Sequence, residues 1–402
     1  MTAPKRTRDG LLLALALGAS LALRLSFFPF VSGDMSGDMI PWSGFIRTHG
    51  AWASWGQAFL NFNYPPLYLY LLTLATYLPL PRLYAIKLVY VIFDYVLAGY
   101  VGALARECGG KRSFWPALLA TLFLPTVLMN SALWGQCDAM YASGLAACVY
   151  YLLRNRSLAA MVAYGLAFAL KPQAVFLAPL ILILVWQRRF SPFLLYVPAA
   201  VYGVLALPAW LAGRPLLNLL LLYANQRIVP FPALTLGATN LYQWLPGAPF
   251  TPFFQLGLVL AGAAALALVI AGCRRLPGGL TAPALLRTAL VCLVLLPFVL
   301  PAMHERYFFA ADALAVAYAF WFPRGWIAAA LIQFASAFTY LPYLFDWEPV
   351  PRPLLAVAMG AALVILLQDV LRTERRQEPA QRDITSPAGD EGPVSTQDFP
   401  TP

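Results

Sequence analysis

Apolar runs alternate with short polar segments along most of the chain, and this spacing predicts a series of membrane-spanning helices. A helix needs about 20 mostly apolar residues to cross the hydrocarbon core of a bilayer. The runs begin near Leu11, Leu83, Phe114, Ala139, Pro192, Pro252, Pro283, Tyr307, Gly325 and Pro353. Together with a divided stretch at 157–187, they indicate about twelve spans. We therefore expect an all-α, polytopic integral membrane protein.

The divided stretch is interrupted by Lys171 and Pro172, which leaves two apolar halves that are each short for a span. Proline removes a backbone hydrogen bond and biases the residue before it away from helix. Because a broken helix at membrane depth requires protein or a water-filled cavity beside it, we expect Lys171 to face a cavity. The alternative is a lysine that extends its ammonium group outward to the membrane surface.

Basic clusters separate many of the apolar runs and set the predicted topology, because positively charged loops stay in the cytoplasm. Residues 65–80 are apolar enough to cross the membrane, but a crossing there would put the later clusters on the opposite side from the first. We therefore interpret residues 65–80 as a re-entrant or interfacial helix, which places both termini in the cytoplasm. The clusters are Lys5/Arg6/Arg8, Arg106/Lys111/Arg112, Arg154/Arg156, Arg188/Arg189, Arg274/Arg275 and Arg372/Arg375/Arg376.

The chain divides into a transmembrane domain at residues 1–371 and a tail at 372–402, whose Glu, Gln, Pro, Ser and Thr content predicts disorder in the cytoplasm. Within the domain, residues 31–64 form an external loop whose aromatic side chains suit an interfacial helix, and residues 212–250 form a second external loop. The basic and then apolar N-terminus resembles a signal peptide, and we interpret it as an uncleaved anchor. The predicted location is the inner (plasma) membrane of the cell, as a multi-pass protein.

Composition agrees with a membrane protein, since 61% of the 402 residues are hydrophobic and 11% are charged. The net charge of +10 comes from cations in short loops beside apolar runs, so we expect no nucleic-acid partner. Five cysteines without a CxxC pair argue against a disulfide framework or a thiolate metal site, and two histidines argue against a multi-histidine site. We expect no cofactor, although carboxylates could hold a divalent cation.

Three polar motifs lie away from the basic clusters, and therefore on the predicted outer face: residues 32–35, 134–138 and 303–308. In the first motif, Asp34 follows the first span and a glycine, so it lies at the membrane boundary. Partial desolvation there would raise its pKa toward values that are useful for a general base. Asp38, four residues further on, would share a proton or a cation with it. The alternative is a pair of solvated loop carboxylates.

The second motif, Trp134-Gly135-Gln136-Cys137-Asp138, places a carboxylate beside an amide and an indole. Asp138 and Gln136 can hydrogen-bond a polar substrate, and Trp134 can stack against the face of a sugar. A membrane aromatic belt followed by a helix-capping aspartate gives the same pattern, so spacing alone leaves both interpretations open.

The third motif contains His304-Glu305-Arg306, the densest polar cluster of the chain. Arg306 can hold a phosphate through two hydrogen bonds, with His304 as a second donor and Glu305 orienting either side chain. Grouped ionisable residues are costly at membrane depth, which favours function over a local Glu–Arg ion pair. Lys171 and Gln173 offer a similar contact for a phosphate or a carboxylate at the helix break.

A separate set of charges lies inside the apolar runs. Lys87 and Asp94 share one face of a predicted helix, and Arg24 lies in the outer half of the first span. We interpret these residues as structural ion pairs between helices.

Taken in order, the motifs resemble those of the GT-C superfamily, multispanning glycosyltransferases that use sugars linked to polyprenyl phosphate. The likeness extends to bacterial members and, more distantly, to the dolichol-phosphate-glucose and dolichol-phosphate-mannose transferases of the endoplasmic reticulum. Each motif is a weak match alone, and the ordered set is more specific. The matching segments, within residues 10–345, are 33–34, 63–68, 134–138, 166–173 and 303–308.

The resemblance implies roles for the residues at the matching positions. Asp34 would activate the acceptor hydroxyl, and its place before Pro41-Trp42 favours it over Asp38, although the repeated Ser-Gly-Asp-Met leaves that choice open. Asp138 would help the acceptor or the base. The donor phosphate would be bound by Lys171, His304, Glu305 and Arg306. The candidates for substrate binding are Tyr64, Trp134, Gln136, Gln173 and Arg227.

The expected activity is that of an inverting glycosyltransferase, whose partners are a polyprenyl-phosphate sugar donor, a glycan or lipid acceptor and membrane lipids. It would move a hexose of the mannose or glucose type to a lipid-linked or cell-envelope glycan at the extracytoplasmic face. The main alternative is a transporter or flippase with Lys87, Asp94 and Lys171 along its path; such folds often contain paired broken helices, and only one break is visible here. A ligase or polymerase with a lipid-diphosphate donor is a second alternative.

Overall fold

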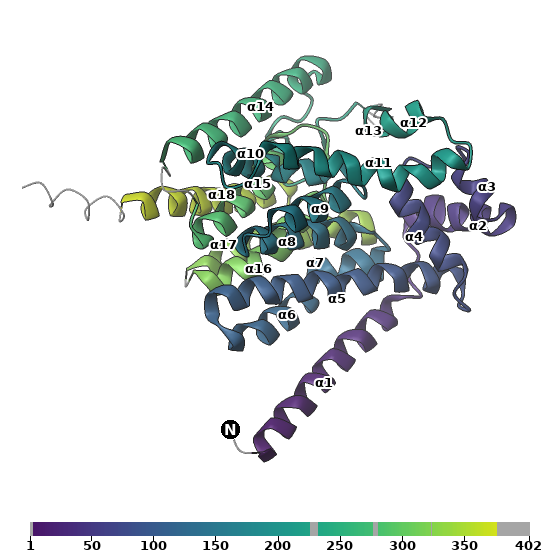
Figure 1. Cartoon of the computed structure of the whole chain (residues 1–402), viewed down its shortest axis with the longest axis horizontal. Coiled ribbons are helices and arrows are strands. Elements are labelled where there is room, and N and C mark those ends of the chain that lie inside the picture. Colours follow the sequence, from purple (N-terminus) through teal and green to yellow (C-terminus); the bar gives the residue numbers. More distant parts are fainter. Residues whose placement is uncertain (1–2, 226–231, 276–279, 323, 376–402) are drawn as a thin grey trace, which may run out of the picture.

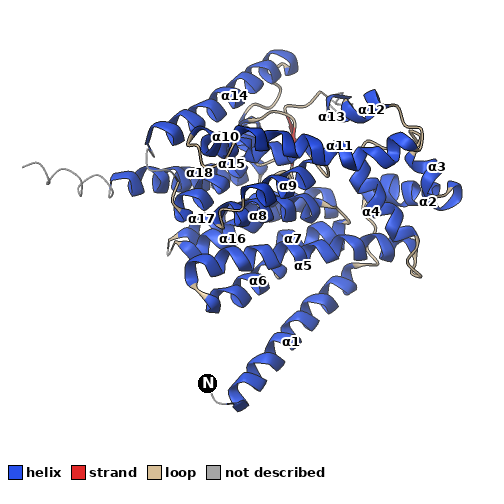
Figure 2. Cartoon of the chain, viewed as in Figure 1, coloured by secondary structure: helices blue, strands red, loops and turns tan. Residues whose placement is uncertain are grey.

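The computed structural model describes residues 3–225, 232–275, 280–322 and 324–375. Helices account for nearly all the regular structure of these residues, and the strands β1 (Thr235–Leu236) and β2 (Met303–His304) form one short pair (Figure 2). The expected all-α class is therefore confirmed. The last helix runs to Arg375, and residues 376–402 of the predicted tail lie outside the described residues.

Seven helices within the described residues are long and apolar enough to cross a membrane. A pair of segments bent by 52° at residues 111–134 adds an eighth if the pair is one span. These helices support a polytopic membrane protein, and the total of about twelve spans stays a prediction. The seven are α1 (Ala3–Phe27), α5 (Arg82–Gly109), α11 (Tyr196–Leu211), α14 (Phe250–Arg275), α15 (Ala282–Val299), α17 (Gly325–Phe345) and α18 (Arg352–Arg375), shown in Figure 1.

Shorter helices complete the bundle, and the stretch around Lys171 is two short helical segments, as predicted. The shorter helices of the bundle are α4 (Pro66–Thr76), α8 (Asp138–Leu153), α9 (Ser157–Phe168), η4 (Pro172–Leu177), α10 (Ala178–Trp186) and α16 (Phe309–Trp321). The bent pair contains η2 (Lys111–Ser113), α6 (Phe114–Leu122), α7 (Pro125–Val127) and η3 (Leu128–Trp134). The remaining helical segments are η1 (Met35–Met39), α2 (Ile40–His49), α3 (Ala51–Trp55), η5 (Pro192–Leu195), α12 (Leu216–Leu220), α13 (Leu222–Asn225) and η6 (Leu241–Trp244).

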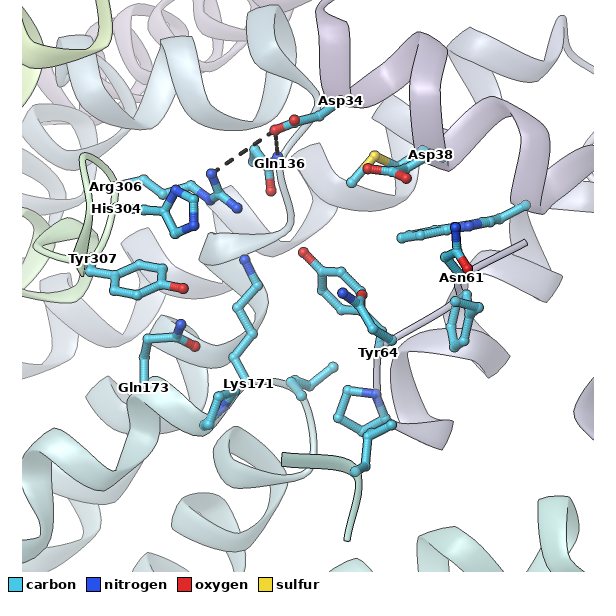
Figure 3. Close-up of a pocket in the computed structure, with 18 of the residues that line it drawn as sticks. Asp34, Asp38, Asn61, Tyr64, Gln136, Lys171, Gln173, His304, Arg306 and Tyr307 are labelled. Carbon is cyan, nitrogen blue, oxygen red and sulfur yellow. Dashed lines mark hydrogen bonds and ion pairs between the residues drawn. The ribbon is translucent and has the colours of Figure 1, made fainter. Parts of the chain in front are cut away.

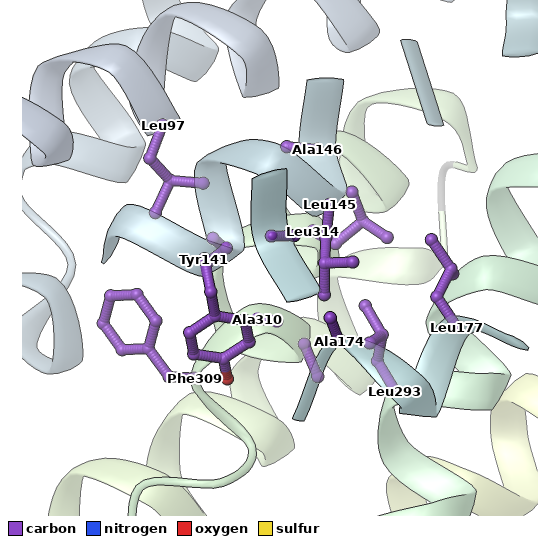
Figure 4. Packing of buried hydrophobic residues seen from close by; sticks show 14 of the residues in the cluster. Leu97, Tyr141, Leu145, Ala146, Ala174, Leu177, Leu293, Phe309, Ala310 and Leu314 are labelled. Carbon is purple, nitrogen blue, oxygen red and sulfur yellow. The ribbon is translucent and has the colours of Figure 1, made fainter. Parts of the chain in front are cut away.

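The core forms where α5, α8, α15 and α16 pack against one another (Figure 4). Leu97, Leu145, Leu293 and Leu314 come from these four helices and are all buried. Small residues allow close approach of neighbouring helices. A Cβ at Gly144 of α8 would lie 2.9 Å from the Ala163 carbonyl oxygen of α9, so glycine permits this contact. The packed centre therefore holds the N-terminal end of α8, where Asp138 lies, in a fixed position.

The charges inside the apolar runs have structural partners. Arg24 of α1 forms an ion pair with Asp94 of α5 at 2.9 Å, which confirms the predicted link between helices. Lys87 has no such pair with Asp94. Its ammonium group donates hydrogen bonds to three carbonyl oxygens, those of Phe27 (3.2 Å), Phe30 (2.7 Å) and Leu133 (2.9 Å). It thereby joins the end of α1 to the end of η3, next to two of the acidic motifs.

Helix α4 covers most of residues 65–80, and the interpretation that this segment does not cross the membrane stays a prediction. It has 11 residues, and a helix of that length extends about 16 Å, half of the roughly 30 Å that a span requires. It contacts α2 and α3, and the three helices lie together at one end of the molecule, where α5 begins (Figure 1). The N-terminal end of α1 and the C-terminal end of α18 lie at the other end (Figure 1).

Candidate functional site

A cavity of about 720 Å³ lies among η1, α2 and the segments that precede η4 and α16 (Figure 3). The three acidic motifs are far apart in the sequence, and all of them contribute side chains to this cavity. The helix break at Lys171 contributes as well. Eight of the candidate residues line the cavity: Asp34, Asp38, Tyr64, Gln136, Lys171, Gln173, His304 and Arg306.

Asp34 is the centre of a hydrogen-bond network. Its Oδ1 accepts a hydrogen bond from the Tyr343 hydroxyl at 2.7 Å. Its Oδ2 accepts from Trp134 Nε1 at 3.0 Å and from Gln136 Nε2, and Arg306 Nη1 lies 4.0 Å away. Burial raises the pKa of Asp34, but Arg306 and these hydrogen bonds outweigh it and leave the pKa below its ordinary value. The expected rise in the pKa of Asp34 is therefore wrong, because the surrounding donors stabilise the carboxylate.

Asp38 lines the same cavity with different surroundings. Its carboxylate has no hydrogen bond or ion pair to any residue in the described part of the chain. Burial raises the pKa of Asp38, the charge of Asp34 raises it further, and Arg306 partly offsets both. Asp34 is thus the more firmly oriented of the two carboxylates, while Asp38 has the higher affinity for a proton.

Two of the motifs adjoin π-helices, whose hydrogen bonds span one residue more than those of an α-helix and which occur frequently at functional sites. η1 begins directly after Asp34, and η3 ends at Trp134. Gly135 then reverses the chain with a φ of 79°, a left-handed conformation that favours glycine. A Cβ there would lie 2.1 Å from the end of the Met35 side chain, so glycine also allows the first two motifs to pack directly together.

Lys171 occupies the helix break between α9 and η4 with an extended backbone. It is 5% exposed, and its ammonium group donates to Asp138 Oδ1 at 2.5 Å. Asn130 Nδ2 donates to the other oxygen of Asp138 at 2.8 Å. The ammonium group also lies 5.6 Å from the centre of the Tyr64 ring. The lysine therefore faces the cavity, as predicted, and does not extend to the membrane surface.

Pairing of β1 with β2 positions the third motif, because Leu236 is in register with His304. The Arg306 guanidinium that follows meets several carboxylates. Its Nε lies 3.6 Å from Asp138 Oδ2, and its Nη1 lies 3.4 Å from Glu305 Oε1. Asp34 completes the set at 4.0 Å. Arg306 thus connects the first and third motifs to the carboxylate that holds Lys171.

Burial shifts the pKa values of His304 and Glu305 in opposite directions. Burial, assisted by the positive charge of Arg306, lowers the pKa of His304 to about 3. The imidazole is therefore neutral at physiological pH and can serve as a hydrogen-bond donor, without a charge, for an anion. Glu305 lies 3.9 Å from His304 Nδ1 and contacts Arg306, so it is placed to orient both side chains, as expected. Burial raises the pKa of Glu305, and Arg306 partly offsets that rise.

Among the described residues, three candidates do not line the cavity: Trp134, Asp138 and Glu305. Trp134 is fully buried, and its ring stacks on Tyr343 at 4.6 Å between centroids, so its expected stacking against a sugar is wrong. From this buried position, Trp134 Nε1 donates a hydrogen bond to Asp34 Oδ2. Asp138 is 1% exposed and lies beneath the cavity, where it would act through Lys171 and Arg306. Arg227 lies outside the described residues.

Some residues at the site had no local signal in the sequence. Tyr343 reaches Asp34 from 309 residues away in the sequence, and a tyrosine near a helix end is also typical of the membrane interface. Asn61 lines the cavity as well. Asn61 has a positive φ of 55°, which a sequence does not reveal for a residue other than glycine. Their contribution depends on tertiary packing of the external segments.

The arrangement places two cations, Lys171 and Arg306, against the carboxylates of Asp34, Asp138 and Glu305. Such a site can hold an anion next to a group that accepts a proton. Among the described residues, no group of three or more His, Cys, Asp or Glu side chains is placed to hold a metal ion. No family model matches the chain, and no curated protein matches it either.

Proposed function

We propose that the chain is an inverting glycosyltransferase that moves a hexose from a polyprenyl-phosphate donor to a lipid-linked or cell-envelope glycan. The observation that carries the proposal is the shared cavity, in which Asp34 and Asp38 lie beside Lys171 and Arg306. The order of the motifs, which resembles that of the GT-C superfamily, supports the choice of donor. The apolar helices around the site support a substrate with a long hydrocarbon chain.

The proposed reaction is a substitution at the anomeric carbon of the donor sugar. The acceptor hydroxyl oxygen attacks this carbon from the face opposite the phosphate, and a new C–O bond forms with inversion. The bond from the anomeric carbon to the phosphate oxygen breaks, and its electron pair leaves with polyprenyl phosphate. A carboxylate takes the hydroxyl proton. Arg306 and Lys171 stabilise the charge that develops on the phosphate.

Asp34 is the proposed base. A carboxylate has about four lone-pair positions, and Asp34 uses three of them for Tyr343, Trp134 and Gln136, which leaves one for a substrate hydroxyl. Its lowered pKa keeps it deprotonated at physiological pH, so it is ready to accept a proton. Asp38 is the alternative base, because its oxygens have no partner in the described residues and its pKa is raised.

Donor binding would also change the partners of Arg306. Of its three carboxylate contacts, the one to Asp34 is the longest, at 4.0 Å, against 3.6 Å to Asp138 and 3.4 Å to Glu305. A donor phosphate is most easily accommodated in place of the longest contact. Arg306 is the largest of the influences that lower the pKa of Asp34. Loss of its contact with Asp34 would therefore raise the proton affinity of this carboxylate when the donor is bound.

In this proposal the cavity opens at the outer face of the inner (plasma) membrane, and the basic clusters lie in the cytoplasm. The seven long helices, the bent pair and the shorter helices α8, α9, α10 and α16 together give about twelve crossings or half-crossings. Helix α4 stays at the outer side. Of the three residues named for the transporter alternative, Lys87 and Asp94 are buried in structural contacts and do not line the cavity, whereas Lys171 does.

The test is a transfer assay with purified protein in nanodiscs, using radiolabelled polyprenyl-phosphate mannose and glucose with membrane glycolipids as acceptors. Replacing a general base lowers a rate by about 10²- to 10⁴-fold, and we expect a loss of this size for Asp34→Asn. Asp38→Asn is assayed in parallel because it tests the alternative base. Asp346→Asn is the matched control, since Asp346 is exposed and has a left-handed backbone that asparagine also adopts.

The results separate the assignments. Transfer that survives in Asp34→Asn and disappears in Asp38→Asn would move the base to Asp38 and leave the glycosyltransferase proposal intact. If the wild-type protein transfers neither sugar to any acceptor, the proposed function is rejected.

A further inference from the structure

The cavity has two chemically different walls. Figure 3 shows His304, Arg306 and Tyr307 on one side of it, with Lys171 and Gln173 below them. Asp38 and Asn61 lie on the opposite side (Figure 3). The lining residues contributed by the first external segment are Asp34, Asp38, Met39, Trp42, Asn61, Phe62, Asn63, Tyr64 and Pro65, and none of them is a cation. An anion would therefore bind the first wall, and a neutral polar group suits the second.

Asn61 is held in an unusual backbone conformation on this second wall. Leu60 and Asn61 both have positive φ values, 44° and 55°, which are uncommon for residues other than glycine. Trp42 Nε1 donates to the Leu60 carbonyl oxygen at 2.9 Å, and Phe62 N donates to the Phe59 carbonyl oxygen at 2.7 Å. Backbones of this kind persist where the surroundings enforce them, and they are concentrated at binding sites. The turn presents the Asn61 amide at the cavity.

The groups on this wall match the hydrogen-bonding needs of a sugar. The Asn61 side chain is exposed and has no hydrogen bond in the described residues, so its two donor positions and its acceptor oxygen are available. Asp38 supplies a carboxylate that accepts hydrogen bonds. Behind them, Trp42 and Phe62 pack edge to face at 4.9 Å and give the wall an apolar part. Hydroxyl groups both donate and accept, and the C–H faces of a sugar ring are apolar, so a neutral sugar uses all of these features.

We propose that this wall is the acceptor subsite and that it selects an uncharged sugar, with Asn61 and Asp38 hydrogen-bonding its hydroxyl groups. The proposal rests on the proposed glycosyltransferase function and narrows its acceptor class. This wall offers no cation to an acceptor that ends in a phosphate or a carboxylate. Such an acceptor would lie beside the carboxylate of Asp38. The acceptor is thus a neutral glycan terminus, and the single negative charge of the donor is received at Lys171 and Arg306.

The experiment measures binding without catalysis, by saturation-transfer-difference NMR on the full chain in nanodiscs. The probes are methyl α-D-mannopyranoside and methyl β-D-glucopyranoside as neutral sugars, and glycerol 3-phosphate as the anion. Asn61→Gly removes the amide and keeps a residue that tolerates positive φ. Asn155→Gly is the matched control, because Asn155 is also exposed, also has a φ of 55° and does not line the cavity.

We expect at least one neutral glycoside to bind the wild type, and its dissociation constant to rise about 5- to 10-fold in Asn61→Gly, the effect of losing one hydrogen bond. Asn155→Gly should bind it as the wild type does. The proposal is overturned if neither glycoside binds, if Asn61→Gly binds it unchanged, or if glycerol 3-phosphate is the probe that depends on Asn61. Glycoside binding that depends on Asn61, together with an absence of transfer in the radiolabel assay, would retain the sugar subsite and reject the transferase.

Discussion

At the scale of single residues, Tyr343 holds Asp34 at two points. Its hydroxyl donates to Oδ1 at 2.7 Å and accepts from the Asp34 backbone N–H at 3.0 Å. A Cβ at Gly33 would lie 3.0 Å from the same hydroxyl, so the glycine before Asp34 leaves the room that this contact needs. Tyr343 is therefore a positioning residue for the proposed base, and it does not need to touch the reacting atoms.

Replacing Tyr343 by Phe removes both contacts and leaves the ring in place. We expect kcat to fall about 10-fold, the effect of one orienting hydrogen bond, with KM for the donor little changed. The Tyr343 hydrogen bond also helps to lower the pKa of Asp34. A base with a lowered pKa works above that pKa and loses activity as pH falls through it, so the acid limb of the kcat/KM profile should move to higher pH in Tyr343→Phe.

The control is Tyr340→Phe on the same helix. The Tyr340 hydroxyl has no hydrogen-bond partner in the described residues, and its ring meets Trp134 edge to face at 5.3 Å. This variant should keep the wild-type kcat and the wild-type acid limb. Identical acid limbs in Tyr343→Phe and the wild type would contradict the positioning role, even if kcat fell.

The sequence identified the charged residues of the site better than the residues that orient them. Asp34, Lys171 and Arg306 were predictable because ionisable groups beside apolar runs are rare and costly. Tyr343 was not, since tyrosine is common at membrane interfaces and nothing local relates it to Asp34. Trp134 was assigned the wrong role because a local sequence does not specify which face of a turn is buried.

At the scale of secondary structure, η1 sets the orientation of Asp34 relative to α2. This π-helix accommodates one residue more than an α-helical turn, and Gly37 at its centre has open space around it: a Cβ there would meet nothing within 4 Å. Deleting Gly37 should return the segment to α-helical spacing and rotate Asp34 by about 100° relative to Trp42. We expect transfer to fall by about 10²-fold or more, because the base is displaced from the reacting hydroxyl.

Thermal unfolding in nanodiscs, measured beside transfer, separates this effect from a loss of folding. Gly37→Ala is the control, since it keeps the number of residues and places its methyl group in open space; it should keep both transfer and unfolding temperature. A deletion variant that unfolds at the wild-type temperature and transfers at the wild-type rate would show that the π-helical turn has no part in orienting the base.

Secondary structure was predicted correctly from the sequence where a single residue type determines the local backbone. Pro172 made the break at Lys171 visible in the sequence. The π-helices were not visible, because the sequences of these segments contain no residue type that specifies one. The predicted ion pairs between helices formed in part: Arg24 pairs with Asp94, whereas Lys87 donates to backbone carbonyl oxygens.

At the scale of the whole molecule, composition was sufficient for the all-α membrane class, whereas the number of spans stays a prediction. Helices such as α9 (12 residues) and α16 (13 residues) are too short for the usual criterion. They pack against other helices, as the buried residues of α16 show, so they count as crossings only if neighbouring protein covers the rest of the membrane depth. The side on which each loop lies was predicted from the basic clusters, independently of helix length, and it stays a prediction.

The last prediction tests that topology and the side on which the cavity opens. If residues 65–80 do not cross the membrane, Gln57 and Asn155 lie on opposite sides; both are exposed and suit replacement by Cys. We expect a membrane-impermeant maleimide to label Gln57→Cys in intact cells and Asn155→Cys only after permeabilisation. Labelling of the unsubstituted protein is the background, and its described cysteines are mostly buried.

Labelling of both variants from one side would mean that the chain crosses at 65–80. Cytoplasmic labelling of Gln57→Cys alone would place the cavity at the inner face, because Gln57 follows α3 at the end of the molecule where α2 and α4 lie.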